Sequence, residues 1–135
     1  MDEKIWRDIS VGKVYRPVLC DDLCRQRCVI EFITELDMNN FAFMEKHLIS
    51  FLKELSNALG MKIFMGPWAG NDFNEETGEC GPSAVVGWTT SGAQIHSWPF
   101  RHFVSVDLYS CKPYEVGRVI EVIENYFRPT LGTVE

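Results

Sequence analysis

The chain has 135 residues, of which 46% are hydrophobic, and its formal net charge is −6. This length fits one domain with a single core. The acidic balance and the lack of a basic stripe argue against nucleic acid as the main partner. No apolar run approaches the roughly 18 residues of a membrane span. The charged N-terminus lacks the apolar centre of a signal peptide, so we expect a cytoplasmic protein that does not insert into membranes.

The hydrophobic pattern of residues 25–135 predicts several strands and two helices. Strands are expected at 28–33, 61–65, 83–89, 93–98 and 103–109. The last is rich in β-branched and aromatic residues, and its alternation puts Val104, Val106 and Leu108 on one face and Phe103, Ser105, Asp107 and Tyr109 on the other. An apolar stripe at helical spacing follows Asn40 and predicts a helix over residues 41–59. A second helix is expected to begin at Pro113 and to end before Pro129, and the last residues could add an edge strand. The order predicts an α+β fold, a two-layer sandwich in which two helices cover one face of a mainly antiparallel sheet.

Two segments do not fit this pattern. Residues 1–24 are interpreted as an N-terminal extension with a short strand at Lys13–Tyr15, separate from the main domain at 25–135. Residues 68–81 are polar, acidic and rich in glycine, and we expect a long loop there.

Three of the five cysteines, Cys20, Cys24 and Cys28, are spaced four apart. A metal cluster would need thiols on one shared face, but Cys28 begins a strand-like run and no fourth ligand lies at a usual spacing. We therefore expect these cysteines to be small buried or half-buried thiols that hold no metal ion.

The stretch from Ser91 to Cys111 carries the residues with chemistry. A hydroxyl (Ser91), an imidazole (His96) and a thiol (Cys111) lie at or near predicted strand ends, where side chains can meet around a cleft. Such a group offers a nucleophile, a base and an acid. Taken singly, each residue fits a structural role equally well, as a turn serine, a strand histidine and a buried thiol.

The segment I-H-S-W-P at 95–99, followed by V-D-L-Y-S-C at 106–111, resembles I-H-T-W-P and D-V-F-T-C of the small prokaryotic S-adenosylmethionine decarboxylases. In this alignment the family's cleavage serine falls on Ser91 and its processing histidine on His96. The catalytic cysteine falls on Cys111, and a second processing serine falls on Ser83. The resemblance extends more weakly over residues 25–128, and it implies the same sandwich fold.

The resemblance also implies a mechanism. The Ser91 hydroxyl would attack the Thr90 carbonyl, with Ser83 stabilising the oxyanion. His96 would then remove the Ser91 α-proton, and the chain would end as two pieces with a pyruvoyl group derived from Ser91. That cofactor forms a Schiff base with the amine of a small-molecule substrate, and Cys111 would return a proton to the product. The family acts in polyamine (spermidine) synthesis, and we expect a homodimer.

Two positions depart from the family. The cleavage serine has a Thr90-Ser91-Gly92 setting in place of Glu-Ser-His. The family's W-P-E carboxylate, which contacts the ribose hydroxyls, is replaced by Phe100, and an apolar side chain cannot accept those hydrogen bonds. The candidate substrate contacts are therefore Trp98, Phe100, Trp68 and Glu31. Glu31 is expected to be buried in the first strand, either in an ion pair or facing the substrate.

Three functions remain open at this point. The first is S-adenosylmethionine decarboxylation with an altered ribose contact. The second is a pyruvoyl decarboxylase retargeted to another amino acid, such as arginine or ornithine. The third is a non-catalytic paralogue that never cleaves and acts as a binding or regulatory subunit.

Overall fold

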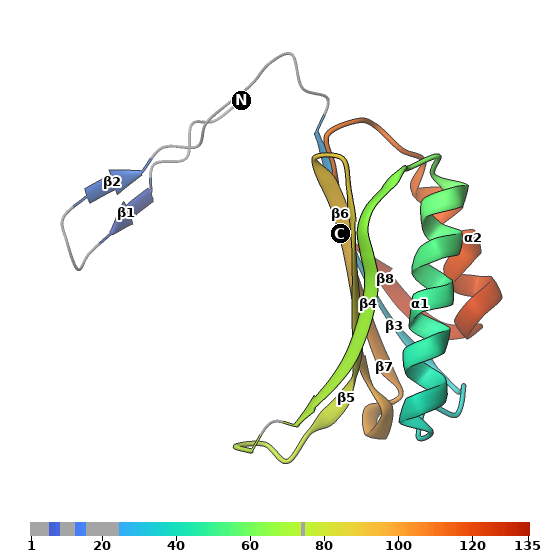
Figure 1. Ribbon diagram of the computed structural model, residues 1–135. Coiled ribbons are helices and arrows are strands. Elements are labelled where there is room, and N and C mark those ends of the chain that lie inside the picture. Colours follow the sequence, from blue (N-terminus) through green and yellow to red (C-terminus); the bar gives the residue numbers. More distant parts are fainter. Residues whose placement is uncertain (1–5, 9–12, 16–24, 74) are drawn as a thin grey trace.

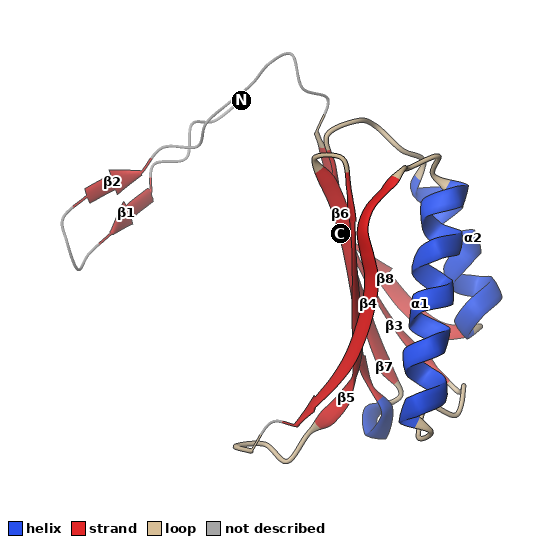
Figure 2. Cartoon of the chain, viewed as in Figure 1, coloured by secondary structure: helices blue, strands red, loops and turns tan. Residues whose placement is uncertain are grey.

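A computed structural model describes residues 6–8, 13–15, 25–73 and 75–135. Residues 25–135 form a six-stranded antiparallel sheet with two helices against one face (Figures 1 and 2). The strands are β3 (Gln26–Thr34), β4 (Ile63–Phe73), β5 (Cys80–Trp88), β6 (Ser91–Trp98), β7 (Phe103–Ser110) and β8 (Pro129–Val134). The helices are α1 (Phe41–Ala58), α2 (Val116–Phe127) and a short 3-10 helix, η1 (Pro99–Arg101). The sheet order is β4-β5-β6-β7-β3-β8, which confirms the predicted two-layer α+β sandwich.

The core lies between the helices and the sheet. Strand β7 alternates as predicted, with Val104, Val106 and Leu108 buried and the residues between them more exposed. Helix α1 begins where the sequence places it, because the Asn40 side chain accepts a hydrogen bond from the backbone N–H of Phe43 at 3.0 Å. Its apolar stripe is buried against the sheet.

The predicted loop at residues 68–81 is wrong. Strand β4 continues to Phe73 and strand β5 begins at Cys80, so the connection is short. Because β4 is at the edge of the sheet, only one side of it must pair, and its glycine and asparagine residues are tolerated there. Helix α2 also differs from its prediction, since it begins at Val116 rather than at Pro113. The expected edge strand at the end of the chain is confirmed as β8.

In the N-terminal segment, β1 (Trp6–Asp8) pairs antiparallel with β2 (Lys13–Tyr15), which confirms the short predicted strand. Of the three spaced cysteines, Cys28 is buried in β3, and Cys20 and Cys24 lie outside the described residues. Within the described ranges, no three His, Cys, Asp or Glu side chains are grouped as metal ligands. The helices in these ranges are too short or too polar to cross a membrane.

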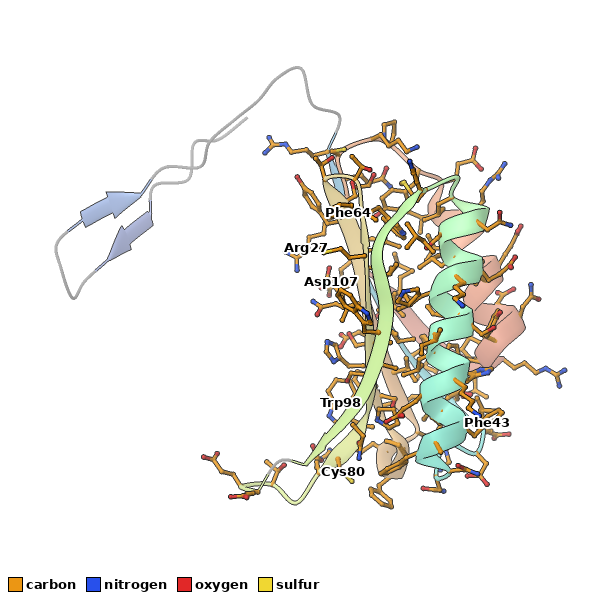
Figure 3. All side chains as sticks on the ribbon, in the orientation of Figure 1. Arg27, Phe43, Phe64, Cys80, Trp98 and Asp107 are labelled. Carbon is orange, nitrogen blue, oxygen red and sulfur yellow. The ribbon has the colours of Figure 1, made fainter. Side chains whose placement is uncertain are left out.

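The face of the sheet that points away from the helices is here called the open face. Neighbouring strands align its residues into rows. One row runs through Ser83, His96, Ser105, Glu31 and Thr133, and the next through Trp68, Val85, Gln94, Asp107 and Val29. Figure 3 shows Arg27, Trp98 and Asp107 on this side. Glu31 is exposed on it, so the expectation of a buried carboxylate is wrong.

Candidate functional site

Ser91 is the first residue of β6 and follows a two-residue turn. Trp88 and Ser91 are paired, so Thr89 and Thr90 alone make the connection from β5 to β6. Thr90 has a φ of 58°, in the left-handed region that a β-branched residue adopts only under strain. The strain of this turn therefore lies at Thr90. Glycine is required at position 92 for a different reason, because an added Cβ would approach the Val86 carbonyl oxygen to 2.8 Å.

Cys111 follows the end of β7 and lies against this turn. Its backbone N–H donates to the Ser91 hydroxyl at 3.0 Å, and the same hydroxyl lies 3.5 Å from the Cys111 Sγ. The Thr90 Oγ1 is 2.8 Å from that sulfur and 2.7 Å from the Thr89 carbonyl oxygen. These three residues form one contact cluster, here called the turn cluster.

The turn cluster lowers the pKa of the Cys111 thiol. The main cause is the hydroxyl of Thr90, followed by that of Ser91, because both can donate hydrogen bonds to a thiolate. Burial acts in the opposite direction, and the charge of Lys112 adds a smaller lowering effect. The thiol in the uncleaved chain is therefore easier to ionise than an ordinary cysteine.

Ser83 and His96 form a second group in the middle of the sheet. They face each other across β5 and β6, and the Ser83 Oγ lies 2.8 Å from His96 Nδ1. The other ring nitrogen, Nε2, is 3.2 Å from the Gln94 Oε1, which can only accept a hydrogen bond. With the proton on Nε2, Nδ1 is an acceptor and Ser83 donates to it. This pair is here called the Ser83–His96 pair.

The structure brings Ser91 to Cys111 and Ser83 to His96, but it does not bring the two groups together. Ser91 and His96 are both on β6, five residues apart, which corresponds to roughly 16 Å along an extended strand. An odd separation also points their side chains to opposite faces. The expected meeting of Ser91, His96 and Cys111 around one cleft therefore does not occur within a single chain.

The predicted substrate contacts are spread over the open face and the end of the sheet next to η1. Trp98 stacks at a tilt on Phe103, with ring centroids 5.1 Å apart, and lies 6.3 Å from the His96 ring. Trp68 is 59% exposed on the edge strand β4, opposite Val85. Phe100 is 71% exposed in η1, past the end of β6 that is remote from Ser91. Glu31 lies two strands from His96 in the same row.

An ion pair that the sequence did not reveal lies on the open face. Arg27 donates two hydrogen bonds to the Asp107 carboxylate, at 3.1 and 2.6 Å. Together with Val85, Gln94 and Tyr109, the pair lines a shallow depression of about 400 Å³ that reaches Gly92, the neighbour of Ser91. The alternation of β7 already placed Asp107 on this face, but the pairing depends on the alignment of β3 with β7, which the sequence does not reveal.

The comparisons with known proteins concern the fold and the family of the chain. The fold is similar to the crystal structure of the adenosylmethionine decarboxylase from Aquifex aeolicus VF5, with a TM-score of 0.57 and 15% sequence identity. The similarity covers 81% of this chain and 85% of that one. No curated protein sequence matches the chain. Residues 26–135 match the family described as S-adenosylmethionine decarboxylase, and the chain therefore belongs to the S-adenosylmethionine decarboxylase family.

Proposed function

We propose that this protein is a pyruvoyl-dependent decarboxylase that makes its cofactor by cleaving itself between Thr90 and Ser91. The observation that carries the proposal is the turn cluster. A serine hydroxyl lies directly after a strained, β-branched residue, and it is hydrogen-bonded to the one thiol that the family alignment assigns to proton donation. Strain at Thr90 raises the free energy of the intact peptide and so favours its cleavage.

The residues of the turn cluster fit the pyruvoyl group. The Ser91 side chain that would become the cofactor lies at the end of a strand, and Cys111 Sγ is 3.5 Å from its oxygen. When formed, the group supplies an electron sink for the electrons released with carbon dioxide. Cys111 is placed to hold a proton close to that position, and the depression lined by Arg27 and Asp107 offers space for the rest of the substrate.

We further propose that the working site is shared by two copies of the chain. The Ser83–His96 pair cannot reach Ser91 in its own chain, but both the pair and the depression lie on the open face. That face also exposes Trp68, Val85 and Tyr109, whose burial against a second sheet would be favourable. The Ser91 side chain points away from the open face, so in such a homodimer the Ser83–His96 pair of one copy would approach the turn cluster of the other around the β5–β6 turn. There Ser83 would donate to the oxyanion and His96 would remove the α-proton of Ser91.

S-adenosylmethionine is the proposed substrate, and polyamine (spermidine) synthesis the proposed context. The presence of Phe100 at the family's ribose carboxylate supports the alternative of another amino acid, such as arginine or ornithine. The distance between Ser91 and His96 in one chain supports the other alternative, an uncleaved paralogue that binds or regulates a partner. The cytoplasmic location and the extra role of residues 1–24 stay predictions.

Mass spectrometry of the purified, denatured protein tests the proposal. Cleavage gives one chain that ends at Thr90 and a second, from residue 91 onward, that begins with pyruvoyl. Ser91→Ala should stay full length, whereas Ser50→Ala, which removes a hydroxyl on the outer helix α1, should cleave like the wild type. Wild-type protein that stays intact after long incubation would overturn the proposal and favour the uncleaved paralogue.

A further inference from the structure

The proposed role of Cys111 conflicts with its surroundings in the uncleaved chain. A proton donor has to be a protonated thiol, yet the Thr90 and Ser91 hydroxyls lower the pKa of Cys111. The Ser91 hydroxyl donates to the sulfur at 3.5 Å. The Thr90 hydroxyl donates to the Thr89 carbonyl oxygen, and it can turn to donate to the neighbouring sulfur once the thiol ionises. A change in these contacts on cleavage would favour the protonated thiol that donation requires.

The atoms involved in cleavage provide that change. The Ser91 Oγ forms a bond to the Thr90 carbonyl carbon while the peptide C–N bond breaks and the hydroxyl proton passes to the freed Ser91 nitrogen, which gives an ester and an amine. Loss of the Ser91 α-proton to a base then breaks the bond between Cβ and Oγ, and the oxygen leaves with Thr90 as one half of a new carboxylate. Water afterwards converts the remaining group to pyruvoyl and releases ammonia. The oxygen that now contacts Cys111 thus ends up as a carboxylate oxygen of Thr90.

This carboxylate is formed in contact with Cys111. Before cleavage its future oxygen accepts the Cys111 backbone N–H at 3.0 Å and lies 3.5 Å from Sγ. Thr90 is two residues from Trp88, which is held in the ladder between β5 and β6, so the new chain end remains close to the sheet. Cleavage also removes the Ser91 hydroxyl, one of the two donors to the sulfur.

We propose that Thr90 is a positioning residue for Cys111 in both states of the chain. Before cleavage its hydroxyl contacts the thiol and stabilises the ionised form. After cleavage its new α-carboxylate accepts the thiol's hydrogen and keeps Cys111 protonated for donation to the product. This inference rests on the proposed cleavage, and it keeps Cys111 protonated up to a higher pH once the cofactor exists.

The charges around the sulfur determine the direction in which the pKa of Cys111 changes on cleavage. A carboxylate beside a thiol disfavours a second negative charge, so it raises the pKa of that thiol, and the loss of a hydroxyl donor acts in the same direction. Lys112, the next residue, opposes this with a positive charge, but its Nζ lies toward the Gly60 carbonyl at 3.4 Å. We expect the two changes together to outweigh this unchanged contribution.

The test measures the pH dependence of Cys111 alkylation by iodoacetamide, followed on the Cys111 peptide by mass spectrometry. Cleaved wild type is compared with His96→Gln, which keeps Thr90 and Ser91 and is expected to stay uncleaved. The pH at which the alkylation rate of Cys111 is half of its maximum should lie about one pH unit or more higher in the cleaved protein. This pH is the midpoint in the comparisons that follow. In the uncleaved background, adding Thr90→Val should raise the midpoint, and Thr90→Ser should leave it low.

The outcomes separate the two proposals. A midpoint that is equal or lower in the cleaved protein overturns this inference while the proposed cleavage stands. An unchanged alkylation midpoint in the Thr90→Val variant would show that the Thr90 hydroxyl does not stabilise the thiolate, and it would overturn the role of Thr90 before cleavage. Intact wild-type mass overturns the proposed function and, with it, the carboxylate, independently of any titration.

Discussion

The helix-covered face and the open face of the sheet use the same strands, yet they carry different residues for different purposes. On β6, Ile95 is fully buried under the helices, and its neighbour His96 points to the open face, where it contacts Ser83. The covered face is filled with aliphatic and aromatic side chains. The open face holds an ion pair, a histidine, a serine and an exposed carboxylate in aligned rows.

This difference shows how one strand can serve stability and chemistry together. Because successive side chains alternate between faces, each second residue is free of packing demands. The same alternation separates Ser91 from His96 and divides the proposed site into the turn cluster and the Ser83–His96 pair. Each prediction below tests this division of roles.

The largest effect is expected from mixing two inactive chains. Ser91→Ala and His96→Gln, each expected to stay uncleaved alone, are co-expressed with tags of different mass. If the two groups come from different copies, the His96→Gln chain should cleave, because its Ser91 meets His96 of the other copy. Denaturing mass spectrometry reads the products. Cleavage in neither chain, despite a mixed dimer in native mass spectrometry, would contradict the shared site.

Cys111→Ala should separate cofactor formation from turnover. We expect normal cleavage, because the Ser91 hydroxyl is retained, and a loss of decarboxylation of about 10² to 10⁴-fold, the usual contribution of a positioned acid. Carbon dioxide release and the mass of the pyruvoyl chain are measured in parallel. The matched control is Cys80→Ala, a half-buried thiol on β5 outside the turn cluster. Unchanged turnover in Cys111→Ala would make this thiol structural.

Phe100→Glu should raise kcat/KM for S-adenosylmethionine by about tenfold to a hundredfold, the worth of one or two hydrogen bonds to a charged acceptor. The side chain is exposed, so the exchange should leave the fold intact. Phe100→Leu serves as the control without an acceptor. Equal or lower activity, with a wild type that saturates at micromolar substrate, would show that another residue, such as Glu31, already contacts the ribose.

The smallest effect concerns the covered side. The Tyr114 hydroxyl is buried, and among the described residues no hydrogen bond to it meets the usual geometry. Burial is the main reason why its pKa is raised, and the neighbouring Cys28 thiol and the Asp107 carboxylate act in the same direction. Below about pH 10, the ordinary pKa of tyrosine, the Tyr114 hydroxyl should therefore not change the free energy of unfolding. Above that pH the free energy of unfolding should fall, because this hydroxyl ionises more readily in the unfolded chain than in the folded one.

Tyr114→Phe should reduce the loss of stability at alkaline pH. It should also stabilise the protein at neutral pH by about 1 kcal/mol, the cost of one unpaired buried hydroxyl. Urea unfolding at neutral and alkaline pH measures both effects. Decarboxylation should not change, since Tyr114 contributes to neither group of the site. A parallel loss of activity would contradict the separation of the two faces.

Local patterns were sufficient to predict most of the elements. The alternation and β-branched content of β7 and the cap at Asn40 depend on neighbouring residues alone, so they were predicted from the sequence and confirmed. Only the first part of the edge strand β4 was predicted, as a strand at 61–65, and its polar half was interpreted as a loop because the strand preference of that half is weak. That half is held by its pairing with β5, a contact that local preference does not describe.

The sequence by itself determined which residue types are available, since the spacing of Ser83, Ser91, His96 and Cys111 is a property of the chain. Only the tertiary structure decided which of them meet. The pairing of β5 with β6 places Ser83 opposite His96, and the turn between these strands places Ser91 against Cys111. Glu31 shows the same limit, because its apolar neighbours predicted burial whereas the helices cover only the other face of β3. Which face is covered depends on how helices pack, and that is set by long-range contacts that no local pattern contains.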